Sequence, residues 1–257
     1  MARERHWRLL DAPAGSGAWH MAVDEAVLEA VRQGLVPPTV RFYRWEKPTL
    51  SLGYAQRTDA LDLAACDREG LEVVRRPTGG RAVLHADDFT YMIAADGLPE
   101  GVSASYRYLA GALSRALGRL GLEAQLVAGP AGQGRSPACF ASATAADLCA
   151  QDRKLIGSAQ VRRGGAVLQH GSLYMRYPRA LADLALGEGH PAPNDLQAAL
   201  GTAPTWEAIR AAFLEGFQAY FGGEWAEGPL TDWERDRALS RQESYREGAA
   251  RAAEFKV

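Results

Sequence analysis

The chain has 257 residues, of which 47% are hydrophobic and 23% are charged, and its formal net charge is −2. These values fit a globular α/β protein with one large domain or two small ones, and they exclude the strongly basic character of many nucleic-acid binders. No apolar run approaches the roughly 20 residues of a membrane span, and the charged N-terminus does not resemble a signal peptide. We therefore expect a cytoplasmic protein with no nucleic-acid and no membrane partner.

The first half of the chain alternates helical patterns with strand-like runs. Apolar residues at helical spacing and nearby turn residues predict the helices, and β-prone runs bounded by Pro or Gly predict the strands. In chain order these are a helix over residues 19–32, strands over 39–45 and 49–54, a short helix capped by Thr58 and ending near Gly70, strands over 71–75 and 89–95, and a helix over 103–120.

The second half begins with a strand over residues 122–127 and a loop over 128–136. The loop is rich in Gly, Ala and Pro, so we expect it to be mobile. Short strands over 146–150, 154–162 and 166–175 follow. Residues 178–257 are expected to form a mainly helical extension, with one helix over 205–221. A last, highly charged helix opens with capping-box spacing at Thr231 and is expected to be solvent-exposed.

The three cysteines, Cys66, Cys139 and Cys149, do not suggest a disulfide framework or a metal site, because they are few, odd in number and without metal-ligand spacing. Cys66 belongs to an apolar helical pattern and Cys149 to a short apolar strand, so both are expected to be structural. Cys139 follows the glycine-rich loop and precedes an aromatic residue. It is either a reactive thiol or inert packing.

Lysine is rare in this chain, since only Lys47, Lys154 and Lys256 occur among 29 basic residues. Where a positive charge alone suffices, the chain uses arginine. Lys154, which enters a predicted strand next to small residues, therefore suggests a need for an amine that Arg cannot replace. The alternative is an exposed lysine on a surface strand.

A second candidate region is the run from Arg75 to His85, Arg-Arg-Pro-Thr-Gly-Gly-Arg-Ala-Val-Leu-His. Paired glycines allow a backbone to approach a ligand closely, and their amides can form an anion-binding nest. An ordinary hairpin turn would have the same appearance.

Together these motifs resemble the lipoate–protein ligase A and octanoyltransferase group, which shares its fold with biotin–protein ligases. The resemblance runs from Met21-Ala-Val-Asp-Glu-Ala26 through Pro48–Tyr54 and the glycine turn to Lys154–Gln160 and His170-Gly171. It implies a single catalytic domain over residues 1–257 with a mixed, largely antiparallel sheet and packed helices.

Two details resemble the octanoyltransferase branch of this group. ATP-using ligases typically have a third glycine where this chain has Arg81, and an Asp soon after the His, where this chain has Ala86 before Asp87 and Asp88. The octanoyltransferase branch has an Ala-Cys-Phe segment whose cysteine is acylated, with an essential lysine 15 positions later. Cys139 and Lys154 have this separation, and the resemblance therefore implies that they are the catalytic pair.

The resemblance also implies acyl carrier protein as the donor partner and a lipoyl-domain protein, such as glycine-cleavage H protein, as the acceptor, with no cofactor or metal. The expected substrate-binding residues are Arg76, Thr78, Gly79, Gly80, His85, Gly157, Ser158, Ala159 and His170. His6, His20 and His190 are expected to be structural or on the surface. Three alternatives stay open: an ATP-dependent lipoate–protein ligase, an enzyme that moves octanoyl between lipoyl domains, and a non-catalytic lipoyl-domain binder.

Overall fold

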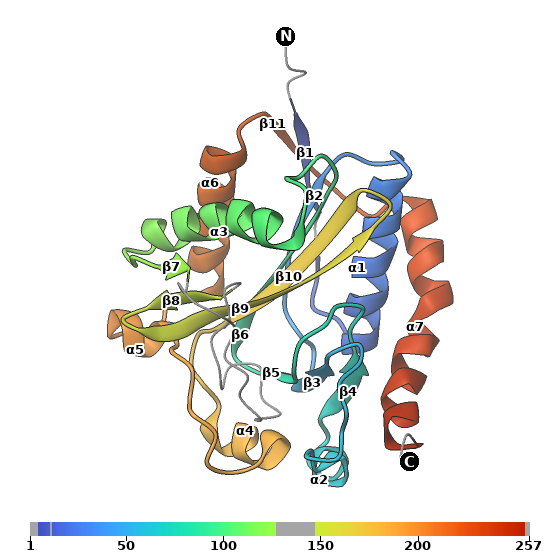
Figure 1. Ribbon diagram of the computed structural model, residues 1–257, viewed down its shortest axis with the longest axis vertical. Coiled ribbons are helices and arrows are strands. Elements are labelled where there is room, and N and C mark those ends of the chain that lie inside the picture. Colours follow the sequence, from blue (N-terminus) through green and yellow to red (C-terminus); the bar gives the residue numbers. More distant parts are fainter. Residues whose placement is uncertain (1–4, 11, 127–146, 255–257) are drawn as a thin grey trace.

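The structure, a computed structural model, describes residues 5–10, 12–126 and 147–254. Within these residues the strands form an eight-stranded and a three-stranded sheet (Figure 1). The large sheet has the order β11 (Glu224–Gly228), β1 (His6–Leu10), β2 (Thr39–Tyr43), β6 (Asp88–Ala95), β10 (Ala166–Tyr174), β9 (Arg153–Arg163), β8 (Leu148–Ala150) and β7 (Gln125–Leu126). The small sheet has the order β4 (Glu72–Arg75), β3 (Thr49–Leu52) and β5 (Val83–His85).

Antiparallel pairing dominates the large sheet, whereas the small sheet has one parallel and one antiparallel pair. Only β11–β1, β1–β2 and β3–β4 are parallel among the described pairs. The described helices are α1 (Gly17–Arg32), α2 (Leu63–Arg68), α3 (Val102–Arg119), α4 (Arg179–Leu186), α5 (Leu196–Leu200), α6 (Trp206–Phe221) and α7 (Asp232–Glu254). The predicted fold class, a mixed and largely antiparallel sheet with packed helices, is confirmed.

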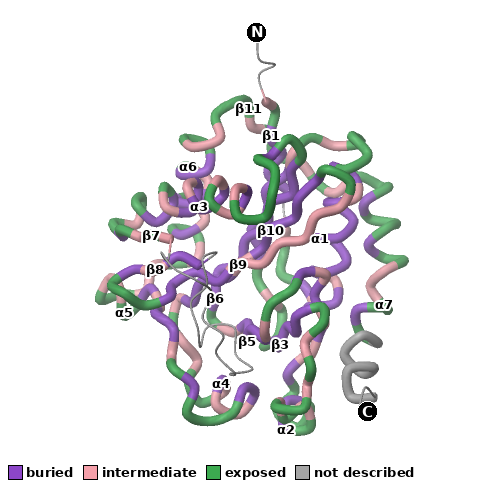
Figure 2. The backbone as a smooth tube through the Cα atoms, in the orientation of Figure 1, coloured by how far each residue is buried: buried purple, intermediate pink, exposed green. Residues whose placement is uncertain are grey.

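Helices cover both faces of the large sheet. On β6, Phe89, Tyr91 and Ile93 belong to the core shared with α3 and α6, whereas Met92 and Ala94 belong to the core shared with α1. Successive side chains of a strand point to opposite faces, so a strand covered on both faces is buried along its whole length. The strands β2 and β6 are accordingly buried throughout, and exposed residues concentrate on outer helix faces and loops (Figure 2).

The terminal helix α7 lies beside α1, on the outside of the same layer (Figure 1). Its capping box is confirmed, because the Thr231 hydroxyl accepts from the Glu234 N–H while the Glu234 carboxylate accepts from the Thr231 N–H. The expectation of a solvated helix was only partly right. Glu234, Ala238 and Tyr245 are buried, and Tyr245 donates a hydrogen bond to Glu25 of α1.

Several other sequence-based expectations need correction. Residues 178–257 are mainly helical, as expected, but they also contain β11, which was not predicted and which extends the large sheet by pairing with β1. The short helix begins at Leu63 and is capped by Asp62 rather than Thr58. Of the strand predicted over 122–127, β7 contains only Gln125–Leu126. The loop predicted over 128–136 and the following Cys139 lie outside the described residues.

Within the described part of the chain, no helix combines the length and the apolar character that a membrane crossing requires.

Candidate active site

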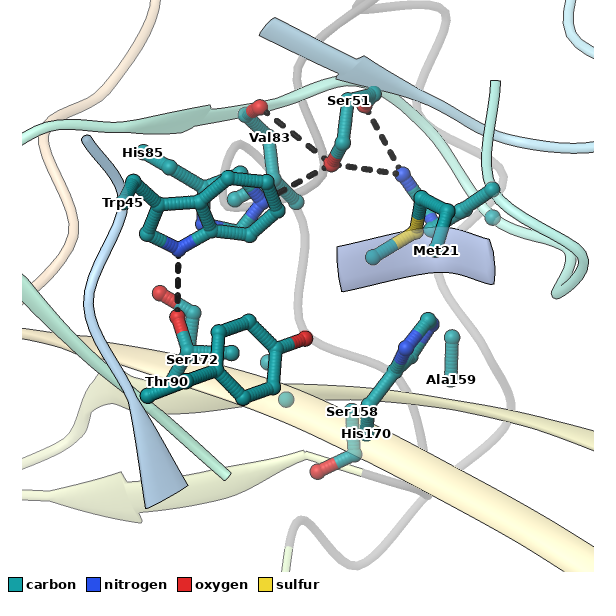
Figure 3. Close-up of a pocket in the computed structure, with 15 residues that line it drawn as sticks. Met21, Trp45, Ser51, Val83, His85, Thr90, Ser158, Ala159, His170 and Ser172 are labelled. Carbon is teal, nitrogen blue, oxygen red and sulfur yellow. Dashed lines mark hydrogen bonds between the residues drawn. The ribbon is translucent and has the colours of Figure 1, made fainter. Parts of the chain in front are cut away.

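A pocket lies between the small sheet and the large sheet, beside α1. Figure 3 shows Trp45, Ser51 and His85 on one side of it and Ser158, Ala159 and His170 on another. Concave sites with mainly apolar walls and a few polar groups commonly bind small molecules or parts of larger ones. The lining residues are Met21, Tyr43, Trp45, Ser51, Arg76, Gly80, Val83, His85, Thr90, Gly157, Ser158, Ala159, His170, Gly171 and Ser172.

The glycine turn forms the rim contributed by the small sheet. Gly80 adopts a left-handed backbone with φ of 94°, which favours glycine. The turn also passes so close to Gly53 that a Cβ there would lie 1.9 Å from the Gly80 carbonyl oxygen. The buried Arg76 guanidinium braces the turn by donating to the carbonyls of Ser51, Gly79 and Arg81. Arg76 thus lines the pocket and also holds its rim in place.

His85 is held at the pocket wall from both of its ring nitrogens. Its Nδ1 lies 2.8 Å from Asp88 Oδ2, and its Nε2 lies 2.9 Å from Ser51 Oγ. Burial lowers the pKa of His85, although the Asp88 carboxylate opposes this effect. The neutral ring therefore donates from Nδ1 to Asp88 and accepts from the Ser51 hydroxyl at Nε2. The Trp45 ring stacks on it with centroids 3.9 Å apart.

Asp88 also organises the neighbouring hydroxyl groups. It accepts hydrogen bonds from Ser172 at 2.5 Å and from Thr90 at 3.1 Å. Thr90 in turn accepts from the Trp45 indole N–H at 2.8 Å (Figure 3). This set of contacts fixes the polar side of the pocket before any ligand binds.

His170 connects the glycine turn to a buried ion pair under α1. Its Nδ1 lies 2.9 Å from Asp24 Oδ2, and its Nε2 lies 2.7 Å from Thr78 Oγ1. Asp24 also accepts from Arg41 at 2.7 Å. Burial alone would raise the pKa of Asp24, but the hydrogen bond from His170 and the charge of Arg41 lower it, so the carboxylate stays ionised.

The wall contributed by the large sheet consists mainly of small residues. Gly157, Ser158 and Ala159 of β9 face the pocket beside Gly171 of β10. A Cβ at Gly171 would lie 2.5 Å from the Gly157 carbonyl oxygen, so the two strands approach too closely for a side chain there. The Tyr91 and Ser158 hydroxyls lie 2.7 Å apart and share a hydrogen bond. Small residues leave room here for a slender apolar ligand.

Lys154 lies on the same strand, three residues before Gly157. It is 6% exposed, and its Nζ lies 2.9 Å from Asp147 Oδ2. The interpretation as an exposed surface lysine is therefore wrong. Lys154 is not among the residues that line the pocket. A strand rises about 3.3 Å per residue, so the Lys154 Cα lies roughly 10 Å along β9 from the Gly157 Cα.

The two cysteines within the described residues have the surroundings of structural residues. Cys66 is fully buried in the core beneath the small sheet, and burial raises the pKa of its thiol. Cys149 pairs with Lys154 across β8 and β9. Burial and the Asp147 carboxylate raise the pKa of the Cys149 thiol, although Lys154 opposes them. Neither thiol is favoured as a nucleophile, because the thiolate is the reactive form.

The structure brings together most of the predicted binding residues, since Arg76, Gly80, His85, Gly157, Ser158, Ala159 and His170 all line one pocket. Thr78 is buried behind His170 rather than at the surface of the pocket, and Gly79 is exposed on the outer side of the turn. Among the other predicted structural histidines, His20 and His190 are buried and His6 is exposed, paired with Glu224.

Sequence reasoning missed the residues that support the pocket. Asp24 lies within the N-terminal motif Met21–Ala26, and Asp88 lies three residues after His85, but their partners could not be read from spacing alone. Trp45 carried no sequence signal beyond its place in a predicted strand, and Ser51 carried none beyond its place in the segment Pro48–Tyr54. In the described ranges, no group of three or more His, Cys, Asp and Glu side chains could hold a metal ion.

Comparison with known proteins defines the class. Residues 16–218 match the family described as "Lipoyl protein ligase A/B catalytic domain". The chain belongs to this family and is an acyltransferase. Octanoyltransferase LipM of Kyrpidia tusciae is 38% identical over 263 residues, covering 93% of this chain and 96% of that protein. Octanoyltransferase LipM of Symbiobacterium thermophilum is also 38% identical, covering 94% and 96% of the two chains. The resemblance to the octanoyltransferase branch is thus confirmed.

Solved structures agree on the fold. Lipoate-protein ligase A bound with ATP superposes with a TM-score of 0.78 at 22% identity, covering 95% of this chain and 99% of that one. A bi-partite lipoate protein ligase from Thermoplasma acidophilum, studied with its E2 lipoyl domain, gives a TM-score of 0.73 at 21% identity, covering 95% and 94%. At these identities the likeness establishes the lipoate–protein ligase fold and nothing finer.

Proposed function

We propose that this enzyme transfers an octanoyl group from octanoyl-acyl carrier protein to a lysine of a lipoyl domain, such as glycine-cleavage H protein, in lipoate biosynthesis. The observation that carries the proposal is similarity to octanoyltransferases over more than nine-tenths of the chain. The pocket fits this role, because its walls of Gly157, Ala159 and Gly171 leave space for a slender acyl chain. The predicted binding residues are proposed to surround the acyl group and its carbonyl.

The proposed nucleophile is Cys139. Its thiolate attacks the carbonyl carbon of the donor thioester, and the tetrahedral oxyanion collapses by releasing the carrier thiolate, which takes up a proton. The new thioester on Cys139 is then attacked by the neutral amine of the acceptor lysine. The Cys139 thiolate leaves, and the amine loses a proton to give the amide. Two steps with a good leaving group replace one difficult transfer.

Lys154 is proposed to supply a positive charge for this chemistry. An ammonium group favours the thiolate form of a nearby cysteine and stabilises an oxyanion as it develops. We propose that no cofactor is required, because a thioester donor is already activated and needs no ATP. A cytoplasmic setting is part of the proposal, since a catalytic thiol must stay reduced.

Mass spectrometry of the enzyme mixed with octanoyl-acyl carrier protein, without ATP, tests the proposal. We expect one octanoyl group on Cys139, which is discharged by a lipoyl domain and by hydroxylamine, and ping-pong kinetics. Cys139→Ser should not turn over, because a serine hydroxyl is far less ionised than a thiol. Cys66→Ser and Cys149→Ser are the matched controls and should keep the chemistry, apart from any loss of stability.

The rival activity of a lipoate–protein ligase gives the opposite results. Free octanoate or lipoate and ATP would then be required, and no adduct would form on Cys139. An active Cys139→Ser variant that depends on ATP would overturn the proposal. Octanoyl transfer from one lipoyl domain to another would appear as an octanoyl-lipoyl domain serving as donor in place of the carrier protein. A non-catalytic lipoyl-domain binder would bind the domain and turn over neither donor.

A further inference from the structure

A buried ion pair joins the start of β8 to the start of β9. Lys154 Nζ lies 2.9 Å from Asp147 Oδ2, with 4% of the lysine side chain and 2% of the aspartate side chain exposed. Asp147 immediately precedes β8. The sequence did not mark this residue, because it falls inside a short run otherwise made of Ala, Leu and Cys.

An ion pair in this position needs a reason other than stability. Removing two charges from water is costly, and well-packed apolar residues of similar volume are often as stabilising as a buried pair. A buried lysine without an acidic partner tends to lose its proton. A carboxylate at hydrogen-bond distance opposes this loss.

The surrounding strands fix where the ammonium can point. The Lys154 carbonyl accepts a hydrogen bond from the Asn194 N–H at 2.8 Å, and the Asn194 side chain donates to the Ala150 carbonyl of β8, so Asn194 ties the Lys154 backbone to β8. On β8, Cys149 is the register partner of Lys154. Lys154 and the carboxylates of Asp147 and Asp152 all lie close enough to Cys149 to act on its thiol, and of these carboxylates Asp147 contacts the lysine directly.

We propose that Asp147 is a positioning residue of the acyl transfer, which keeps Lys154 protonated and directs its ammonium, so that Lys154 acts as a fixed cation rather than as a proton-accepting base. The inference rests on the proposed function, because it assigns a partner to the proposed catalytic lysine. It goes further by distinguishing two roles that a lysine can have in acyl transfer, namely a cation that stabilises negative charge and a base that accepts a proton. A base must lose its proton in the resting enzyme, and the carboxylate of Asp147 opposes that loss.

The test compares the full-length enzyme with Asp147→Asn, which keeps the shape and removes the charge. The chain has only three lysines, so ε-carbon-labelled lysine gives three resolvable NMR titrations. We expect Lys154 to titrate at lower pH in the variant than in the wild type, because the adjacent opposite charge is gone. The kcat should fall with little change in KM, and the high-pH limb of the kcat profile should move to lower pH with the lysine.

Glu234→Gln is the matched control, because it also breaks a buried ion pair, with Arg8 on β1. It should lower stability and leave the Lys154 titration and the shape of the pH profile unchanged. If Asp147→Asn does the same as the control, Asp147 is merely structural and the inference is overturned.

A second variant covers the case in which Asp147→Asn does not fold. Asp147→Glu keeps the charge on a longer side chain, so Lys154 should titrate as in the wild type while kcat falls; a wild-type kcat would overturn the positioning role. The NMR readout does not depend on activity. Failure of the proposed function would instead appear as full activity in Cys139→Ser or Lys154→Arg, whatever the lysine titration shows.

Discussion

At the scale of single residues, the burial of Lys154 indicates that arginine cannot replace this lysine. The ammonium occupies an enclosed position against Asp147, where the wide, planar guanidinium of Arg does not fit. We expect Lys154→Arg to remain folded and to lose activity by about 100-fold or more, the scale typical of one lost transition-state contact. Single-turnover transfer from octanoyl-acyl carrier protein measures the effect. The exposed Lys47→Arg is the control and should behave as wild type, whereas near-normal turnover with Arg at 154 would remove Lys154 from the mechanism.

The residues of the pocket divide into those that a sequence can reveal and those that it cannot. The glycine turn and the Lys154 strand were found because paired glycines, and a rare lysine among many arginines, are unusual in themselves. Asp24 and Asp147 were missed because their significance comes from partners. Asp24 contacts His170, 146 positions away, and no local pattern encodes that contact. Sequence reasoning therefore identified the rim and wall of the pocket but not the buried charges that support them.

At the scale of elements, the approach of the glycine turn to the end of β3 is a sensitive point. A Cβ at Gly53 would lie 1.9 Å from the Gly80 carbonyl oxygen, and a backbone atom cannot move aside cheaply. We expect Gly53→Ala to displace the turn, to lower the free energy of unfolding by about 1–3 kcal/mol as overpacking does, and to reduce activity. Chemical denaturation and transfer kinetics measure both effects.

In contrast to Gly53→Ala, the substitution Gly118→Ala is expected to stabilise the protein. Gly118 lies on the exposed side of α3, and a Cβ there would meet nothing within 4 Å. Alanine should therefore raise stability through helix propensity, by at most about 0.8–1 kcal/mol because Gly118 lies in the last turn of α3, with activity unchanged. A Gly53→Ala protein as stable and active as the wild type would show that the turn tolerates displacement.

The elements that were predicted and those that were missed differ in where their stability comes from. The helix α1 and the strand β6 carry apolar residues at the spacing of their own structure, so their sequences suffice. The strands β1 and β11 do not. The segment Glu-Trp-Ala-Glu-Gly of β11 has no alternating apolar pattern, and it is a strand because it pairs in parallel with β1. Tertiary pairing of this kind overrides local propensity.

At the scale of the whole molecule, the core between α1 and the large sheet contains buried charged and polar groups, and each of them needs a hydrogen-bond or ion-pair partner within the core. His20 Nε2 lies 2.7 Å from the Arg44 carbonyl, and its Nδ1 lies 2.6 Å from the Arg41 guanidinium. The ring thus donates from Nε2 and accepts at Nδ1. A second proton would face a positive charge. Burial, together with the charge of Arg41, lowers the pKa of His20 to about 3.

This arrangement implies that the whole fold is sensitive to acid. The folded-state pKa of His20 lies below its unfolded value of 6.5, so the unfolded chain binds the proton first as pH falls. The contribution of His20 is fully present above pH 6.5 and is lost as pH falls toward 3, at about 1.4 kcal/mol per pH unit. The lowered pKa of His85 acts in the same direction. We expect the stability measured by urea unfolding to fall with pH between 6.5 and 4.5, and His20→Gln to reduce the slope by about one proton, or about 1.4 kcal/mol per pH unit. His6→Gln, at an exposed position, should leave the slope unchanged. A His20→Gln protein with the wild-type slope would show that protonation of this buried ring does not limit stability in acid.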